Sequence, residues 1–221
     1  MLKLYSSSIS PFSARVELVL RAKGVPFEDL GSPEVSWPEL GRKSPAYLAL
    51  NPMGKVPVLI LEDGTPLTES ETIITYLDEA YPDPPLQPTD RAARARMRTA
   101  IRICESYVAM PIQLTFPMLA PADRNEDALT HLFAQLDRGL GALERYVPDG
   151  TYFVGEKLSL ADIIVFTTLY VAAVIPGVFG RPDLLAGRPK LMAWFERAHR
   201  DPLLADAHLR LKAGSQTPPS H

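Results

Sequence analysis

The sequence predicts a small α/β domain followed by an all-helical domain, with a proline-rich linker between them. Short apolar strand-like segments alternate with helical segments before residue 81, whereas only helical periodicity follows residue 88. Four prolines lie within the eight residues from Tyr81 to Pro88, and such a segment cannot continue a helix. The expected division is an α/β domain at 1–80, a linker at 81–88, a helical domain at 89–212 and a flexible tail at 213–221.

The first domain is expected to contain a βαβ unit followed by a ββα unit. Leu2–Tyr5 is predicted to be a buried strand, and the helix of Pro11–Lys23 to end at Gly24. Phe27–Leu30 would be the next strand, parallel to the first because a helix crosses between them. The remaining elements are expected to be strands at 56–61 and 65–67 and a helix at 69–81.

Composition and targeting signals limit the classes of function. A net charge of -3 argues against a protein that binds the nucleic-acid backbone. The chain does not open on a charged segment followed by an apolar one, which predicts a cytosolic protein, and the apolar run 163–178 is expected to be too short to span a membrane. The single Cys104 and the scattered histidines predict no metal site.

Ser10-Pro11 stands at the junction of the first strand and the first helix, where two interpretations compete. A serine before proline is a good helix cap, because its hydroxyl satisfies a free amide and proline suits the first helical position. Alternatively, a hydroxyl beside the positive end of a helix can donate a hydrogen bond to an anion. Taken alone, the pattern does not separate capping from function.

Two further segments have the same ambiguity. Asn51–Leu59, N-P-M-G-K-V-P-V-L, can be a loop that leads to an edge strand starting at a proline. Glu69 and Ser70 can be part of an ordinary helix start. However, Ser70 with the free amides of that helix end also suits a carboxylate, and Glu69 can pair with an ammonium group.

Together and in this order, the three segments resemble serine-type cytosolic glutathione transferases. Ser10–Val16, S-P-F-S-A-R-V, is most similar to the S-P-F-x-x-R-V turn of the tau class. Asn51–Leu59 resembles the family's N-P-x-x-x-V/I-P-x-L segment, and Leu67–Ile73 its E-S-x-x-I element. The resemblance implies a thioredoxin-like N-terminal domain that binds glutathione and an all-α C-terminal domain that shapes a second, apolar site.

The resemblance also implies a catalytic role for Ser10. In the family this hydroxyl donates a hydrogen bond to the glutathione sulfur and favours the thiolate, which is the nucleophile. Both thiols of the C-x-x-C turn of thioredoxin-like domains are replaced by hydroxyls here, so redox chemistry is disfavoured. Only Ser10 lies six residues before Val16, as in the tau, theta and zeta patterns. The competing hydroxyls are those of Ser6, Ser7, Ser8 and Ser13.

Further contacts with glutathione as the cosubstrate are implied by the same resemblance. The backbone of Val56, before a cis Pro57, is expected to pair with the cysteinyl part of glutathione. Ser70 is expected to hold the γ-glutamyl carboxylate, and Glu69 the ammonium group beside it.

The glycyl carboxylate has two candidate partners. Lys43 lies in an R-K-S-P stretch that resembles the K-S-P stretch of the tau class and is preferred, with Lys55 as the alternative. The family resemblance further implies a homodimer. Composition, and not the resemblance, is the reason to expect no nucleic-acid and no membrane partner.

Gly155–Asp162 resembles a buried capping element of the family's helical domain. Ser159 and Asp162 have the spacing of a capping box, and Leu158 with Ile163 fits a hydrophobic staple. This segment is therefore expected to direct folding rather than catalysis.

A glutathione transferase that attacks a small, electrophilic, partly apolar substrate is the preferred function. The residues expected to line the substrate site are Phe12, Tyr107, Pro111 and Leu114. A zeta-like cis–trans isomerase ranks second, because the zeta turn reads S-S-C where this chain has S-P-F. A non-catalytic binding module ranks third, since Ser10 and Glu69 are both present.

Overall fold

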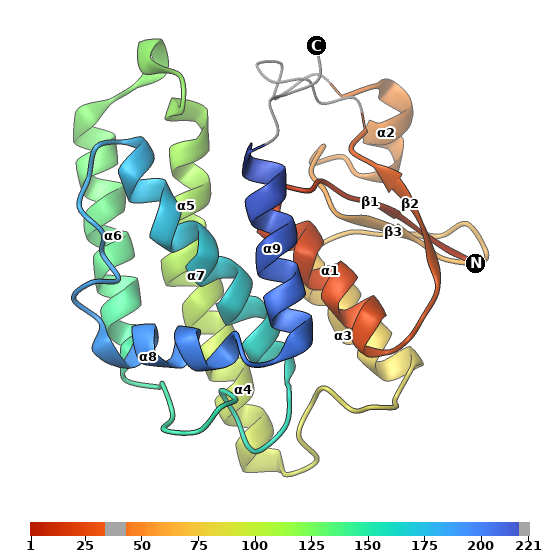
Figure 1. The fold of residues 1–221 in the computed structure, drawn as a ribbon. Helices are drawn as coiled ribbons and strands as arrows, with labels where there is room; N and C mark the ends of the chain where they lie inside the picture. Colours follow the sequence, from red (N-terminus) through yellow and green to blue (C-terminus); the bar gives the residue numbers. More distant parts are fainter. Residues whose placement is uncertain (34–42, 217–221) are drawn as a thin grey trace. The chain divides into compact units, whose positions relative to one another are not determined.

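The structure is a computed structural model that describes residues 1–33 and 43–216 (Figure 1). It divides into two compact units, Met1–Pro85 together with the segment that begins at Ala205, and Leu86–Leu204. The division between Pro85 and Leu86 falls inside the expected linker. The C-terminal segment differs from the expectation, because it groups with the first unit and not with the helical one.

The first unit contains a four-stranded mixed sheet in the order β2-β1-β3-β4. Its strands are β1 (Leu2–Tyr5), β2 (Phe27–Gly31), β3 (Val58–Ile60) and β4 (Pro66–Leu67). β1 runs parallel to β2 and antiparallel to β3, which in turn is antiparallel to β4. This order confirms the predicted βαβ unit and hairpin. The third strand begins after Pro57, because proline has no amide hydrogen to donate to a ladder.

Helices α1 (Pro11–Ala22) and α3 (Ser70–Ala80) pack together in the first unit. On α1, Val16, Val19 and Leu20 are fully buried, as their spacing predicts. These helices and the sheet form the α/β layer arrangement of a thioredoxin-like domain.

A short helix, α2 (Pro45–Leu50), lies in the connection before Asn51, where no helix is predicted. The Ser44 hydroxyl caps it by accepting a hydrogen bond from the Tyr47 amide at 3.2 Å, and Pro45 occupies its first position. The Ser-Pro signal for a helix start was thus present in the sequence.

The second unit is almost entirely helical, as predicted (Figure 1). Its elements are α4 (Arg91–Ile103), η1 (Cys104–Ala109), α5 (Met110–Thr115), η2 (Phe116–Met118), η3 (Pro121–Asp123), α6 (Glu126–Glu144), α7 (Leu160–Val178) and α8 (Pro189–Ala198). The segment η1 packs against α4, α5, α6 and α7, α5 packs against α6, and α4 packs against α7.

The segment η1 is π-helical, although simple α-helical periodicity is predicted through it. Pro111 follows it and has no amide hydrogen to donate to the carbonyl of Tyr107, four residues earlier; in an α-helix its ring would also clash with that carbonyl. The wider turns of a π-helix accommodate such an interruption.

The start of α7 confirms the predicted capping box. The Asp162 carboxylate accepts hydrogen bonds from the Ser159 amide at 2.8 Å, the Ser159 hydroxyl at 2.6 Å and the Phe153 amide at 2.5 Å. Asp162 is fully buried, and burial raises its pKa to about 6, although the three hydrogen bonds act in the opposite direction.

Helix α7 is longer than the apolar run suggests. Its 19 residues, with a mean hydropathy of 1.9, are sufficient by length and composition to cross a membrane, so the expectation that the run is too short was wrong. However, 67% of its apolar window is buried inside the structure. Its apolar character therefore serves the core of the second unit.

The last helix, α9 (Pro202–Gln216), begins in the second unit and continues in the first. Residues 213–216, where the flexible tail is predicted to start, are helical. Residues 217–221 lie outside the described part of the chain.

Candidate functional site

Three predicted motifs meet at one end of the sheet in the first unit. Tyr5 pairs with Val58, and Leu59 pairs with Leu67. Because both pairs are antiparallel, the chain after Tyr5, before Val58 and after Leu67 leaves the sheet at the same end. Those three segments carry Ser10, Val56-Pro57 and Glu69-Ser70.

Ser10 is the N-cap residue of α1 and is half-exposed. Its Oγ accepts a hydrogen bond from the Ser13 amide at 3.2 Å, and its own amide donates to the Ser7 carbonyl at 3.0 Å. A hydroxyl that accepts one hydrogen bond still has its proton to donate. The capping and the anion-binding interpretations are therefore compatible, since Ser10 can cap α1 and donate at its positive end.

Two of the competing hydroxyls are buried and already have partners. Ser6 donates to Asp29 Oδ1 at 3.0 Å, and the Ser13 hydroxyl accepts from the Ser7 amide at 3.1 Å. Ser7 is half-buried and Ser8 is exposed. Geometry thus favours Ser10 over Ser6 and Ser13, while Ser7 and Ser8 remain open alternatives.

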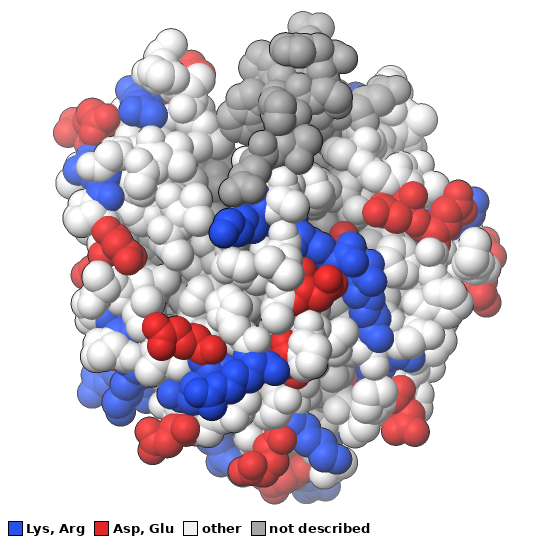
Figure 2. All heavy atoms as spheres, viewed as in Figure 1, with Lys and Arg blue, Asp and Glu red and all other residues white. Residues whose placement is uncertain are grey.

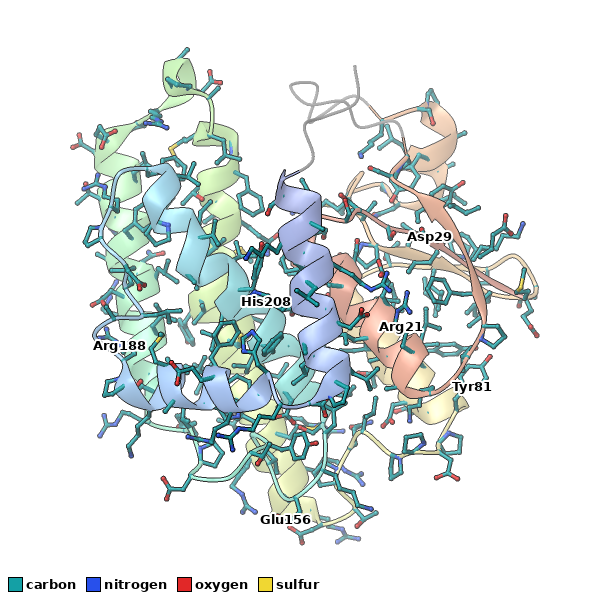
Figure 3. The ribbon with its side chains drawn as sticks, viewed as in Figure 1. Arg21, Asp29, Tyr81, Glu156, Arg188 and His208 are labelled. Carbon is teal, nitrogen blue, oxygen red and sulfur yellow. The ribbon has the colours of Figure 1, made fainter. Side chains whose placement is uncertain are left out.

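Two carboxylates, those of Glu17 and Asp29, interact with each other and with Ser6 at the start of this turn. Burial and the neighbouring Asp29 raise the pKa of Glu17 on α1, while Arg21 and Arg210 act in the opposite direction. Asp29 on β2 and Arg21 on α1 are labelled in Figure 3. The interaction with Arg210 connects α9 to α1 within the first unit.

The loop before Pro57 is held by two side chains. The carbonyl of Lys55 accepts hydrogen bonds from Tyr47 Oη at 2.8 Å and from Asn51 Nδ2 at 2.7 Å. Burial raises the pKa of Tyr47 to about 12, so the phenol stays protonated and remains a donor. The Val56–Pro57 peptide bond is cis, as the family resemblance implies.

Glu69 has a φ of 66°, the only positive φ among the described residues that are not glycine. This conformation is costly for a residue with a side chain, and such outliers concentrate at functional sites. The Glu69 side chain is exposed and makes no capping hydrogen bond. Glu69 therefore occupies the N-cap position of α3 without capping the helix through its side chain.

Ser70 is buried and accepts a hydrogen bond from Arg15 Nη1 at 3.3 Å. Arg15 is itself fully buried, and its guanidinium lies 4.5 Å from the centre of the Phe12 ring. The Arg15 side chain thus links α1 to the start of α3 and places a positive charge beside Ser70.

The two lysines differ in their surroundings. Lys43 is half-buried, its Nζ lies 5.6 Å from the centre of the Tyr47 ring, and burial lowers its pKa. A Cβ on Gly54 would lie 3.2 Å from Lys43 Cγ, so the lysine stem packs on the loop that leads to Pro57. Lys55 is exposed. The geometry favours Lys43 as a member of the site.

The expected substrate residues do not share one environment. In the second unit, Tyr107 and Leu114 are 58% and 50% exposed, with the equally apolar Met110 between them at 50%. Pro111 is buried, together with Ile112 and Thr115 of the same helix, so it differs in exposure from Tyr107 and Leu114. Phe12, in the first unit, is half-buried beneath Arg15.

Three residues that hold the site are not assigned by sequence reasoning. Arg15 and Asn51 stand inside the quoted motifs, so their positions were visible although their partners were not. Tyr47 carries no sequence signal, because its bond to Lys55 depends on how α2 folds against the loop.

The described residues contain no group of three or more His, Cys, Asp or Glu side chains that could hold a metal ion. Acidic and basic side chains are interspersed over the face shown in Figure 2.

Comparison with known proteins matches both units. The family model "Glutathione S-transferase, N-terminal domain" matches residues 4–85, and "Glutathione S-transferase, C-terminal domain" matches 126–197. The chain is 33% identical to a maleylacetoacetate isomerase of Pseudomonas aeruginosa, over 90% of this chain and 95% of the relative. It is 30% identical to a glutathione S-transferase of Pseudomonas putida, over 93% and 90% respectively.

A solved structure has the same fold. The glutathione S-transferase of Methylobacterium radiotolerans, in complex with glutathione sulfonate, superposes with a TM-score of 0.77 at 29% identity and covers 93% of each chain.

Proposed function

The chain belongs to the glutathione S-transferase family, and on that premise we propose that it activates the thiol of glutathione for attack on a small electrophile with apolar parts. The observation that carries this proposal is the meeting of Ser10, cis Pro57 and Ser70 at one end of the sheet.

Ser10 is proposed to donate its hydroxyl proton in a hydrogen bond to the glutathione sulfur. Its oxygen already accepts from the Ser13 amide, which leaves the proton for the ligand. The N-terminus of α1 adds a positive dipole that favours the thiolate. A free thiol has a pKa of about 8.5, and each unit of depression corresponds to about 1.4 kcal/mol.

In the proposed reaction the thiol proton passes to solvent and the thiolate forms a sulfur–carbon bond with the electrophile. In a substitution, the leaving group departs with its electron pair. In an addition, the carbanion that forms takes up a proton. Ser10 is thus a hydrogen-bond donor throughout and not a covalent nucleophile.

The rest of glutathione would be held along the same edge. Val56 precedes cis Pro57 and lies outside β3, which begins at Val58. Its backbone therefore suits strand-like pairing with the cysteinyl part of glutathione. Ser70, with Arg15 at 3.3 Å and the free amides of α3, suits the γ-glutamyl carboxylate. Exposed Glu69 suits the ammonium group, and Lys43 is preferred over Lys55 for the glycyl carboxylate.

Binding to immobilised glutathione tests the proposal directly. The protein should be retained and then released by free glutathione. A panel of substitution, conjugate-addition, peroxide and isomerisation assays would next identify the reaction. Failure to bind at millimolar glutathione would contradict the proposal and its isomerase alternative together.

A glutathione-dependent cis–trans isomerase is the second candidate, favoured by the 33% identity to a maleylacetoacetate isomerase. In that reaction glutathione adds to a double bond, rotation follows, and elimination regenerates glutathione. Stoichiometry separates the candidates, because a transferase consumes one glutathione per product and an isomerase consumes none. A third candidate, a binding module without activity, predicts retention on glutathione and no turnover in any assay.

The family also supports the proposals of a cytosolic location, a role in detoxification and a homodimer. A mass near that of one 24.4 kDa chain by light scattering, across a wide concentration range, would contradict the homodimer.

A further inference from the structure

We propose that Gly214 of α9 is a positioning residue for Ser10. Because Gly214 has no side chain, the end of α9 can lie against the backbone of Ser8 and hold the turn that presents the Ser10 hydroxyl. The inference rests on the proposed function, in which Ser10 donates to the glutathione sulfur.

The contact between Gly214 and Ser8 excludes any larger residue. A Cβ on Gly214 would lie 2.6 Å from the Ser8 carbonyl oxygen, 2.8 Å from its carbonyl carbon and 2.9 Å from its Oγ. The first two are backbone atoms, so no rotamer change of Ser8 would relieve the overlap. Both residues belong to the first unit.

Ser8 is a central residue of the turn that ends at Ser10. The Ser10 amide donates to the Ser7 carbonyl at 3.0 Å, which closes the turn around Ser8 and Ile9. Ser13 holds both ends, since its hydroxyl accepts from the Ser7 amide at 3.1 Å and its amide donates to Ser10 Oγ at 3.2 Å. Gly214 contacts the turn between these two ends, at Ser8. Because Ser8 is only two residues before Ser10, a shift of the Ser8 carbonyl would also shift Ser10.

The inner face of α9 ends at this contact. Leu204, Ala207 and Leu211 are buried at helical spacing, and Gly214 continues their face by one more turn. Arg210 interacts with Glu17 of α1, and Figure 1 shows α9 running beside α1. Glycine is unfavourable within a helix, so the close approach to Ser8 supplies a physical reason for its presence.

Replacement of Gly214 by alanine would force either the Ser8 carbonyl or the end of α9 to move. Hydrogen bonds weaken steeply when distance and angle depart from their preferred values. The Ser10 hydroxyl would then stabilise the thiolate less, and the pKa of the bound thiol would rise. Contacts at Val56, Glu69 and Ser70 belong to other segments, so glutathione affinity would change little.

The test compares Gly214→Ala with Gly177→Ala. Gly177 is also helical, in α7, and has no atom within 4 Å of the position of an added Cβ. For each protein, the absorbance of the thiolate is titrated with glutathione bound, and glutathione affinity and Tm are measured. Gly214→Ala is expected to raise the bound thiol pKa by about one unit, which lowers kcat/KM below that pKa by about tenfold. Gly177→Ala should leave the thiol pKa unchanged.

A second pair of variants removes the contact between Gly214 and Ser8 instead of introducing a steric overlap there. A chain that ends at Lys212 lacks Gly214, whereas a chain that ends at Gln216 keeps it. The thiol pKa should rise in the first variant and not in the second. This pair keeps the proposal testable if Gly214→Ala fails to fold.

The outcomes are distinguishable. An unchanged thiol pKa in Gly214→Ala, or a loss of Tm and affinity without a pKa change, would overturn the positioning role while the proposed function stands. If the unaltered protein does not depress the thiol pKa at all, the proposed function and the positioning role are both overturned.

Discussion

Gly139 of α6 lies directly against the carbonyl group of Tyr107 in η1. A Cβ on Gly139 would be 1.9 Å from the Tyr107 oxygen and 2.5 Å from its carbonyl carbon. The same carbonyl is the one to which Pro111 cannot donate a hydrogen bond. One proline and one glycine, 28 positions apart, thus allow η1 and α6 to approach at backbone distance.

Gly139→Ala should therefore destabilise the protein strongly. The overlap involves backbone atoms on both sides, so relief requires α6 and η1 to separate, at a cost of ~3 kcal/mol or more. Unfolding by urea, followed by circular dichroism, measures the loss. Gly177→Ala is the matched control and should gain roughly 0.5 to 1 kcal/mol from helix propensity. Similar effects of the two substitutions would contradict the packing argument.

Asp162→Ala should damage folding more than chemistry. It removes the acceptor for three hydrogen bonds at a buried helix start, which is expected to cost ~2 kcal/mol or more out of a stability of roughly 5 to 15 kcal/mol. Tm should fall, while the surviving folded fraction keeps near-normal affinity for glutathione. Full stability with lost activity would instead mark Asp162 as a catalytic carboxylate.

The pH dependence of stability should contain a contribution from Asp162. Its folded-state pKa of about 6 lies above the ordinary value of 3.8, so the folded state holds the proton more tightly than the unfolded state. The resulting stabilisation is complete below about pH 4 and is lost as the pH rises through about 6, a change of ~3 kcal/mol. Urea unfolding of the unaltered protein and of Asp162→Asn across this window isolates the effect. A difference between them that does not vary with pH would contradict it.

Ser10→Ala should lower the rate at neutral pH with little change in glutathione affinity. The lost donor to an anion is worth ~1.5 to 3 kcal/mol, or roughly ten- to a hundred-fold in rate. Ser10→Thr keeps both the hydroxyl and the N-cap acceptor and should retain most of the activity. Unchanged activity in Ser10→Ala would shift the donor role to Ser7 or Ser8.

Substitutions at Glu69 should separate backbone strain from ligand binding. Glu69→Gly relieves the positive φ and is expected to raise the free energy of unfolding by about 1 kcal/mol, whereas Glu69→Gln retains the strain and the stability. Both variants lose the carboxylate and should weaken glutathione binding by about tenfold or less. Calorimetric titration and thermal melts on the same preparations check both effects. If Glu69→Gly binds glutathione as tightly as the unaltered protein, the carboxylate has no part in the site.

Much of the first unit and of the capping element could be predicted from the sequence, because these features depend on short segments. Strand and helix periodicity located β1, α1 and α3, and the spacing of Ser159 and Asp162 located the start of α7. The three segments proposed to bind glutathione were also local, since each is a run of fewer than ten residues.

The tertiary structure alone decided what depends on contacts between distant segments. Antiparallel register brings the three motifs to one sheet end, and Arg15 reaches Ser70 across 55 positions. Contacts between distant segments also decide the placement of α9 with the first unit. They likewise decide the close approach of Gly214 to Ser8 and that of Gly139 to Tyr107. From the sequence, a glycine in a helix is recognisable only as a weak helix former. Its packing role is not visible there, because the backbone that occupies the place of its missing side chain comes from a distant part of the chain.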